Sequence, residues 1–389
     1  MPIVRQPGAP APYQQIREIL RKEILETMSA GDRVPPEREL AERFGANRAT
    51  VSRALAALVS EGLLVRRAAR GTFVAGGAGL ARTRTRTVGL VVPDIEGPFP
   101  AGVIRAAVRE LRRHSYKPVL LEYDDSVLTE AREVARLTEE GLDGALVITR
   151  GLPENWPAYD QLVRLGYPIV FLDHKPLDLE ADCVATDHFR WAYEAVCTLI
   201  ARGHSRIAHF TYMGGRTHSS IEERRQGYEQ ALTDNGIEVD PELVVPPVVY
   251  PHDYFVYKHV LSYLRQIVDP ITAVFGLNDS YALSAIVACR ETGASVPDEV
   301  EIASFFDGGF DPVSQMPPLI KVVQRQDEIA RAGVELVMSR IEDAGPDGPQ
   351  TIAVPADIVN ELEAVQNGVS DFHARRGFTS AGTNHQVRA

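Results

Sequence analysis

The sequence predicts an α/β protein in which a small N-terminal domain of helices and a hairpin precedes a two-lobed body built on parallel sheets. Two observations lead to this prediction. Residues 36–74 contain two short helical patterns followed by two short apolar strands, whereas apolar strands alternate with helical patterns from residue 87 to about 360. Continuous apolar strands joined by helices indicate a parallel sheet covered on both faces.

Charge is divided unevenly along the 389 residues, whose length suggests two or three domains. Residues 1–87 hold 15 Lys and Arg against 8 Asp and Glu, whereas the remaining residues hold 26 against 45. A basic head on an acidic body favours nucleic acid at one end of the chain.

Local sequence patterns predict the elements of the N-terminal domain. We expect residues 1–11, which are rich in Pro, to form a disordered arm, and residues 12–28 to form an amphipathic helix with Ile16, Leu20 and Ile24 on its apolar face. Two further helices surround Gly45, with apolar residues at Leu40, Ala41 and Phe44 and then at Val51, Leu55, Leu58 and Val59. This is a helix-turn-helix, and the domain extends over residues 12–75.

In a helix-turn-helix the second helix enters the major groove, and its first residues face the base edges. We expect Arg48 to contact a guanine; a solvated helix face is the alternative. A hairpin or wing should follow over residues 63–74, with basic residues near its tip that contact phosphate or the minor groove. The predicted DNA contacts at the helix start are Asn47, Arg48, Thr50 and Ser52, and those on the wing are Arg66, Arg67 and Arg70.

Residues 35–74 resemble the winged helix of GntR-family transcription factors. The family has a Pro-Ser-Glu-Arg entry, a Ser-Arg-x-Thr-Val start of the recognition helix and a Gly-x-Gly-Thr-Phe-Val wing. Arg38, Arg48, Thr50 and Gly71 match this pattern, so the resemblance adds Arg38 and Gly71 to the DNA contacts. Pro36, Ala69 and Ser52 depart from it, and we do not transfer a base contact to Arg53.

After a predicted linker at residues 76–87, the body at residues 88–360 should form two successive α/β lobes with a cleft, and residues 361–389 should be a disordered tail. Ligands in such sheets bind beyond the carboxyl ends of the strands. Polar and aromatic side chains at these ends suit a polyhydroxylated ligand. They are Asp94, Phe99, Asp173, Asn278, Asp279 and Asp307.

The body is similar to the effector domain of the LacI/GalR family, which itself resembles periplasmic sugar-binding proteins. The motifs occur in family order: VGLVVPDIEGPF, VFLD, ARGHSRIAHF, SSIEERRQGYEQAL, TAVFGLNDSYAL, GASVPDEVEIASFFD and PPLIKVVQ. The resemblance implies a periplasmic-binding-protein-like fold. The ligand contacts that it implies are Asp173, Ser220, Arg224, Asn278, Asp279 and Gln324, with Tyr250 as a stacking aromatic residue. Gly308 stands where the family often has a second Asp.

Structural roles are the alternatives at these positions. Asp173 and Asp307 could be helix N-caps or hydrogen-bond acceptors, and Asp279 could cap the helix that follows it. Of the neighbours Arg224 and Arg225, one should face water. His204 is expected to be a loop residue, not a ligand.

Several classes of function are disfavoured. No nucleophile elbow, phosphate-binding loop, zinc-protease motif or dinucleotide fingerprint is found. The cysteines Cys183, Cys197 and Cys289 lie in apolar segments and are expected to be core residues. No signal peptide and no stretch of about 20 apolar residues is present, so we expect a cytoplasmic protein without a membrane span. We also expect no metal and no cofactor.

The combination of a GntR-like head and a LacI-like body is similar to that of arabinose-repressor-type regulators. They imply a homodimeric transcription regulator, a repressor that binds a double-stranded operator and responds to a sugar-like effector. A regulator of a non-sugar metabolite such as a purine, an enzyme, and a ligand-binding protein without DNA function are the alternatives.

Overall fold

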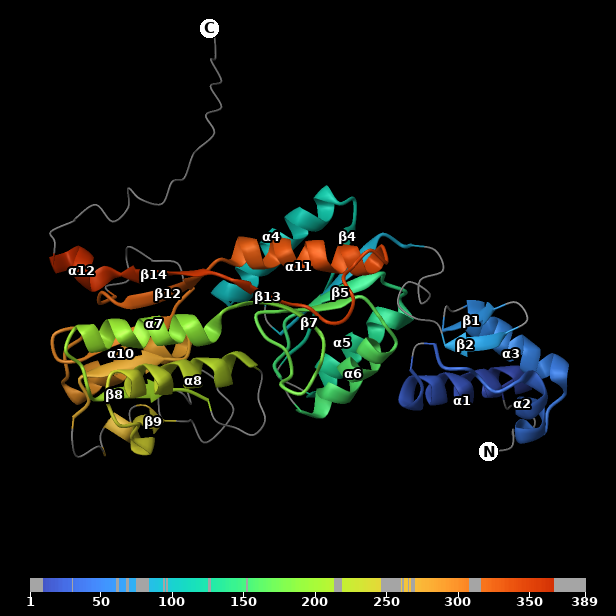
Figure 1. Cartoon of the computed structure of the whole chain (residues 1–389), viewed down its shortest axis with the longest axis horizontal. Helices are drawn as coiled ribbons and strands as arrows, with labels where there is room; N and C mark the ends of the chain where they lie inside the picture. The colour runs from blue at the N-terminus through green and yellow to red at the C-terminus, as the bar shows by residue number, and fades with distance from the viewer. Residues whose placement is uncertain are drawn as a thin grey trace, which may run out of the picture.

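The computed structural model describes residues 10–29, 31–60, 63–67, 70–74, 84–93, 95, 97–124, 127–151, 153–212, 219–245, 260, 262–264, 266, 270–307 and 316–366. Three parts follow one another along the long axis of the molecule: the head, the first lobe and the second lobe (Figure 1). Asp94 and Tyr250, both predicted ligand contacts, lie outside the described residues, as do Gly308 and most of the linker.

The head is a helix-turn-helix with a two-stranded wing, as predicted. Leu40, Phe44, Val51 and Leu55 are almost fully buried in its core, which explains the apolar spacing of the two helices. Gly45 ends the first of them with a φ of 60°, a conformation that favours glycine. The elements are α1 (Pro12–Thr27), α2 (Glu37–Phe44), α3 (Arg48–Ser60) and the antiparallel strands β1 (Leu64–Arg67) and β2 (Gly71–Val74).

The first lobe is a parallel six-stranded sheet of order β13-β7-β6-β5-β3-β4. Helices α4 and α11 cover one face, and α5 and α6 cover the other (Figure 1). The strands are β3 (Thr87–Val92), β4 (Lys117–Glu122), β5 (Gly144–Val147), β6 (Ile169–Leu172), β7 (Asp182–Thr186) and β13 (Thr351–Val354). The helices are α4 (Pro98–Arg113), α5 (Val127–Glu139), α6 (Trp156–Arg164), the short 3-10 helix η2 (Pro153–Asn155) and α11 (Gln326–Ile341).

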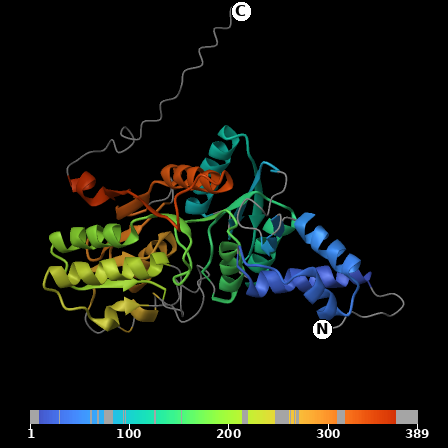
Figure 2. The same cartoon turned by 45° about the vertical axis from the view of Figure 1, so that its right-hand side comes forward.

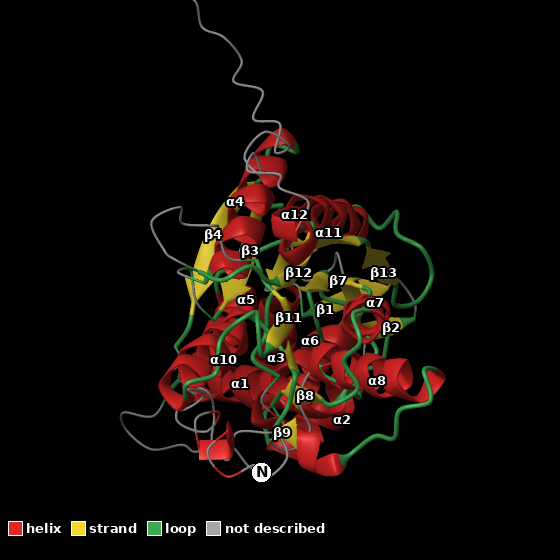
Figure 3. Ribbon diagram, turned by 90° about the vertical axis from the view of Figure 1, so that its left-hand side faces the viewer, coloured by secondary structure: helices red, strands yellow, loops and turns green. Residues whose placement is uncertain are grey.

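The second lobe repeats this plan with a six-stranded sheet of order β14-β12-β11-β10-β8-β9, in which only the β12–β14 pair is antiparallel. Viewed from the end of this lobe, the strands run between layers of helices (Figure 3). The strands are β8 (Ile207–Phe210), β9 (Val244–Val245), β10 (Ala273–Gly276), β11 (Glu301–Phe305), β12 (Ile320–Gln324) and β14 (Ala356–Asn360). The helices are α7 (His188–Ala201), α8 (Ser219–Asp234), η3 (Pro241–Leu243), α10 (Asp279–Thr292) and α12 (Glu361–Gln366).

The chain crosses between the lobes three times within the described residues. It does so at Asp187 between β7 and α7, at Arg325 between β12 and α11, and at Pro355 between β13 and β14. These crossings bring the carboxyl ends of strands from both sheets together, so strand-end side chains of one lobe can contact those of the other.

The sequence analysis did not identify every element, and β7, β14 and α12 are among those that it missed. β14 is an edge strand that includes the polar residues Asp357 and Asn360, so it lacks a continuous apolar run. β7 begins at the polar residue Asp182, whose carboxylate binds Arg340 at 2.7 Å. In α12, Leu362 is 3% exposed and Glu361 binds Lys321 at 2.6 Å. The boundary expected at residue 360 therefore leaves out six residues that belong to the second lobe.

The head contacts the first lobe through α6. Leu165, which follows the last residue of α6, is 1% exposed and belongs to the apolar cluster of the head, together with Ile16 and Leu20 of α1. Two views show the head beside the α5 and α6 side of the lobe (Figures 1 and 2). The end of the linker is held separately, because the backbone N–H groups of Thr85 and Arg86 each donate to the carboxylate of Asp143 at 2.9 Å.

Candidate functional site

The first candidate surface is the start of α3. The side-chain oxygen of Asn47 accepts hydrogen bonds from the backbone N–H and the hydroxyl of Thr50, both at 2.7 Å. This is N-cap geometry, so these two residues hold the beginning of the helix in place. Arg48 lies between them, is exposed, and has no hydrogen bond or ion pair with the part of the chain that the structure describes.

The other arginines of the head differ in their surroundings. Arg66 was expected near the wing tip, but its guanidinium turns back to the helices, where it binds Glu37 at 3.2 Å and Ser52 at 3.4 Å. Arg67 lies over the ring of Phe73, 5.0 Å from its centroid, and Arg70 is exposed in the turn before Gly71.

Two further residues of the head are placed clearly. Arg38 is paired with Glu42 at 3.1 Å and remains 77% exposed. Arg53 stacks on Tyr13 of α1 at 4.1 Å, so its guanidinium contributes to packing between helices. Arg48 at the helix start and Arg67 and Arg70 on the wing are exposed and have no ion pair in the described ranges. Arg33 and Arg53 of the head share this property.

The second candidate site lies where the two lobes meet, and Asp173 is at its centre. Asp173 follows β6 with a φ of 71° and is 7% exposed. Its Oδ1 accepts from Nε2 of Gln324 at 2.7 Å, and its Oδ2 faces Nδ1 of His174 at 2.8 Å. Burial would raise the pKa of Asp173, but the imidazoles of His188 and His174 hold this pKa well below its usual value.

His188 connects Asp173 to Arg224. Its Nε2 lies 2.8 Å from the backbone oxygen of Asp173, and its Nδ1 faces the guanidinium of Arg224 at 3.2 and 3.3 Å. Because a guanidinium can only donate, Nδ1 must accept, which leaves the proton on Nε2. His188 is fully buried, so this contact fixes the tautomer and position of the ring.

Arg224 points into the site, whereas its neighbour Arg225 does not. The Nη1 of Arg224 donates to the carbonyl of Leu277 at 2.6 Å, and the guanidinium lies 3.6 Å from the ring centroid of Phe305. Burial lowers its pKa, although nearby carboxylates oppose this effect. Arg225 pairs instead with Glu222 at 2.6 Å and with Glu229.

The ends of β10, β11 and β12 supply a second group of polar residues. The backbone N–H of Gln324 donates to Oδ1 of Asp307 at 2.9 Å, and the backbone N–H of Asp307 lies 3.3 Å from Oδ2 of Asp279. Asn278 caps α10, because its side-chain oxygen accepts from the backbone of Ser280 at 3.1 Å. The alternative in which Asp279 caps this helix is therefore wrong, and its carboxylate faces Asp307 instead.

The structure thus brings most of the predicted strand-end residues into one connected group. Ser220 lies one turn before Arg224 on α8 and is 3% exposed. Phe99, in the first turn of α4, packs partly buried against the apolar core between α4 and the sheet. The connected residues are Asp173, Arg224, Asp279, Asp307 and Gln324, with Asn278 at their edge.

Sequence analysis missed His174, His188 and Phe305 as members of this group. His174 is next to Asp173, and His188 follows the crossing after β7, so the general rule on strand ends would have included both. His188 was missed because β7 itself was not identified. Within the described ranges, no three His, Cys, Asp or Glu side chains are grouped as a metal ion would require.

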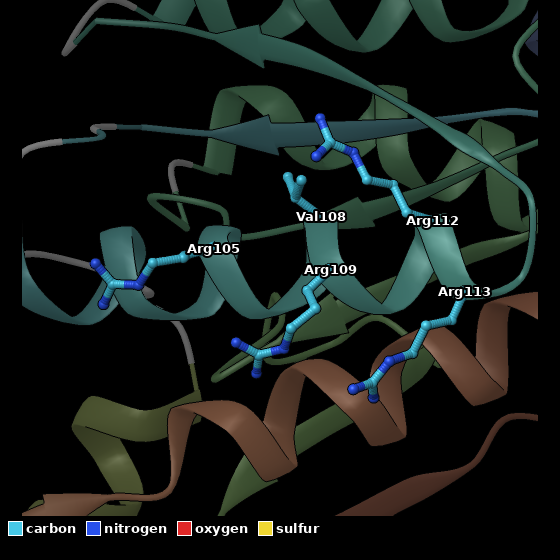
Figure 4. A pocket seen from close by; sticks show the side chains of 5 residues that line it. All are labelled: Arg105, Val108, Arg109, Arg112 and Arg113. Atoms are coloured by element: carbon cyan, nitrogen blue, oxygen red, sulfur yellow. The ribbon is translucent and has the colours of Figure 1, made fainter. Parts of the chain in front are cut away.

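A hollow of about 560 Å³ lies elsewhere, on the outer face of α4 (Figure 4). Its lining includes two paired arginines, because Arg109 binds Asp327 at 3.1 Å and Arg113 binds Glu110 at 2.8 Å. Arg105, Val108 and Arg112 complete the lining. None of the predicted ligand residues lines this hollow, so it is distinct from the group around Asp173.

Comparison with known proteins agrees with this two-part architecture. Residues 85–357 match the family described as periplasmic binding proteins and sugar binding domain of LacI family. The chain belongs to this family. Residues 12–74 match bacterial regulatory proteins of the gntR family, so a GntR-type head is joined to a LacI-type domain.

Several relatives that share the LacI-type domain are named as transcription regulators. The arabinose metabolism transcriptional repressor of Geobacillus stearothermophilus is 26% identical over 343 residues, which cover 86% of this chain and 92% of that protein. The repressor PurR of Mannheimia succiniciproducens is 27% identical over 262 residues, 66% of this chain and 75% of that protein. The regulator CelR in complex with cellobiose has the same fold, with a TM-score of 0.63 and 23% identity over 84% of this chain and 99% of that chain.

A membrane span would need a longer and more apolar helix than any found among the described residues.

Proposed function

We propose that this protein is a homodimeric transcription repressor whose affinity for its operator is set by a small sugar-like effector bound between the two lobes. The observation that carries the proposal is the hydrogen-bonded group in which Asp173 of the first lobe meets His188 and Gln324 of the second. A ligand that contacts both lobes can change DNA affinity only if it binds one arrangement of the lobes better than the other.

The effector site consists of the strand-end residues. Asp279 and Asp307 would accept hydrogen bonds from hydroxyl groups, and Arg224 and Asn278 would donate to hydroxyl oxygens. The buried ring of Phe305 lies under the guanidinium of Arg224 and would hold it in place. Asp94, Phe99, Ser220 and Tyr250 belong to the proposed site on the resemblance and on strand-end position.

The proposed operator contacts fall into two groups, base contacts and backbone contacts, according to where each arginine lies. Arg48, which projects from a helix start held by Asn47 and Thr50, would contact a base in the major groove. Arg67 and Arg70 of the wing and Arg38 of α2 would contact the sugar-phosphate backbone.

A second copy of the chain is part of the proposal, because one winged helix contacts too few base pairs for a specific site and a two-fold operator needs a two-fold protein. Support comes from α10, on which Leu283 and Val287 are one turn apart and 43% and 44% exposed. A monomer in sedimentation velocity at micromolar concentration, free and on DNA, would contradict the dimer.

The proposal assigns no catalytic role to the chain and places it in the cytoplasm with its DNA. Fluorescence anisotropy with the DNA upstream of its own gene, in the presence of arabinose, ribose, cellobiose and adenosine, tests the sensing function. We expect saturable binding that one of these compounds changes at least tenfold. Binding of an effector without any binding of DNA would favour the ligand-binding alternative, and turnover of the compound would favour an enzyme.

Asp279→Ala gives the decisive variant. We expect it to lose the effector response, because one of the carboxylates is removed, whereas operator binding without effector should persist because the head is unaltered. Asp298→Ala, which removes an exposed carboxylate beyond α10, is the matched control and should respond normally. An unchanged response in Asp279→Ala would place the effector elsewhere.

A further inference from the structure

The proposed effector site has more carboxylates than cations among its described residues. Its buried guanidinium, that of Arg224, already donates hydrogen bonds to other protein groups. Arg224 donates to the carbonyl of Leu277 and to Nδ1 of His188, which are both neutral acceptors. The next cation along the chain, Arg225, pairs with Glu222 and Glu229 outside the site. Within the described part of the site, cations that could pair with further carboxylates are therefore scarce.

Asp173 takes most of the donors that exist. Its carboxylate and backbone oxygens face Nε2 of Gln324, Nδ1 of His174 and Nε2 of His188 at 2.7 to 2.8 Å. Its ionised form is therefore well solvated by protein groups.

Asp307, in contrast to Asp173, accepts few hydrogen bonds from the protein. Its Oδ1 accepts one hydrogen bond, from the backbone N–H of Gln324 at 2.9 Å, and the carboxylates of Asp279 and Asp173 are the charges that face it, opposed by Arg224. Arg325, which follows Gln324, does not compensate because it pairs with Asp357 at 2.8 Å. Burial, with a further contribution from Asp279 and Asp173, raises the pKa of Asp307 to about 7.

We infer that a proton on Asp307 and the effector compete for the same place, so that the effector binds by donating a hydroxyl or amine hydrogen to this carboxylate and expels the proton into solvent. The inference rests on the proposed function, since it concerns the same site. In the exchange, the carboxylic acid loses its proton to water, and the resulting carboxylate accepts a hydrogen bond from the ligand without any covalent change.

The sign of the pH dependence follows. A donor ligand stabilises ionised Asp307 and lowers its pKa in the complex, so affinity should fall as the pH decreases below 7, by up to about tenfold per pH unit for one proton. An anionic ligand would place another negative charge beside Asp173, Asp279 and Asp307. It would require proton uptake, and its affinity should rise as the pH decreases.

Isothermal titration calorimetry on the full chain tests this inference. Glucose, glucosamine, glucuronate and glucose 6-phosphate form one matched set of probes, and ribose with ribose 5-phosphate forms another. Titrations between pH 5.5 and 8.5, each in two buffers of different ionisation enthalpy, give both the affinity and the number of protons exchanged. We expect a neutral or cationic member to bind with release of about half a proton at pH 7, since about half of the sites are protonated there.

Asp307→Asn is the key variant, because Asn can still accept from the backbone of Gln324 but cannot titrate. It should bind with no proton release from this position and with a flatter pH dependence. His174 is retained in both proteins, so the difference between them isolates Asp307; Asp298→Asn is the control and should behave as the wild type. Binding restricted to anionic probes, or a wild-type pH dependence in Asp307→Asn, would overturn the inference.

A separate measurement distinguishes this inference from the sugar proposal. Infrared difference spectra of the unliganded wild type and Asp307→Asn separate a carboxylic acid from a carboxylate as the pH changes. A midpoint near 7 supports competition at Asp307 even if no probe binds, in which case the sugar proposal alone fails. A midpoint near 4 overturns the inference whatever the ligand is.

Discussion

Nε2 of Gln324 donates to Oδ1 of Asp173 at 2.7 Å, and this hydrogen bond joins the end of β12 in the second lobe to the end of β6 in the first. The same amide nitrogen lies 3.1 Å from the hydroxyl of Thr186, at the end of β7. Gln324 and Asp173 are 6% and 7% exposed. A buried bond of this kind couples the lobes, because separating them would leave a carboxylate without one of its donors.

The strength of this coupling can be measured with Gln324→Ala. Loss of a buried donor to a charged acceptor should lower the free energy of unfolding by about 1 to 3 kcal/mol, as measured by urea denaturation. Gln230→Ala is the control, because Gln230 makes its 2.7 Å bond to Asp234 on the exposed face of α8. Equal losses in the two variants would show that the interlobe bond contributes nothing particular.

The head permits a test of the division between base and backbone contacts. Arg48→Ala should weaken binding to the operator by about 1 to 3 kcal/mol and change binding to random DNA little, because a bidentate base contact discriminates between sequences. Arg70→Ala on the wing should weaken both alike and reduce the salt slope by about one. The measurement is anisotropy over a range of salt concentrations, and an equal loss for Arg48→Ala on both DNAs would assign this residue to phosphate.

Arg66 gives a further comparison on the same assay. Its guanidinium binds Glu37 and Ser52, so it is less available to phosphate than Arg70. A larger loss of DNA affinity from Arg66→Ala than from Arg70→Ala would show that these internal contacts are released on DNA.

The raised pKa of Asp307 also predicts how the free energy of unfolding depends on pH in the absence of ligand. Its pKa is raised to about 7 in the folded protein, above the unfolded value of about 3.9, so the folded state binds more protons between these pH values. The contribution of Asp307 to the free energy of unfolding should therefore decrease as the pH rises from about 4 to 7, and Asp307→Asn should remove this loss. We expect Asp307→Asn to be more stable than the wild type at pH 8 by a few kcal/mol, and much less so at pH 4.5, in urea denaturation. A constant difference at both pH values would contradict the raised pKa.

Leu165 links the head to the first lobe and is open to a direct test. Because it is 1% exposed within the apolar cluster of the head, Leu165→Ala should weaken the docking of the head and increase proteolytic cleavage between residues 75 and 83. Arg164→Ala is the control, since Arg164 is 45% exposed and pairs with Asp160 on the surface of α6. Equal cleavage rates for Leu165→Ala and Arg164→Ala would mean that the contact does not hold the head.

The sequence by itself determined most of the elements, the division into head and two lobes, and several of the strand ends at which polar residues gather. It could do so because apolar spacing records which face of a helix or strand is buried, and because glycine at a left-handed position, as at Gly45, ends a helix wherever it occurs. Both family resemblances rest on such local patterns, and Arg48 and Asp173 were predicted as site residues in this way.

Only the tertiary structure decided which polar groups contact one another. Asn278 rather than Asp279 caps α10, Arg224 rather than Arg225 enters the site, and Arg66 turns back to Glu37. Each choice depends on partners far away in sequence, as when Gln324 meets Asp173 across 151 positions. The pKa of Asp307 depends in the same way on burial and on carboxylates brought from other strands, which no local pattern contains.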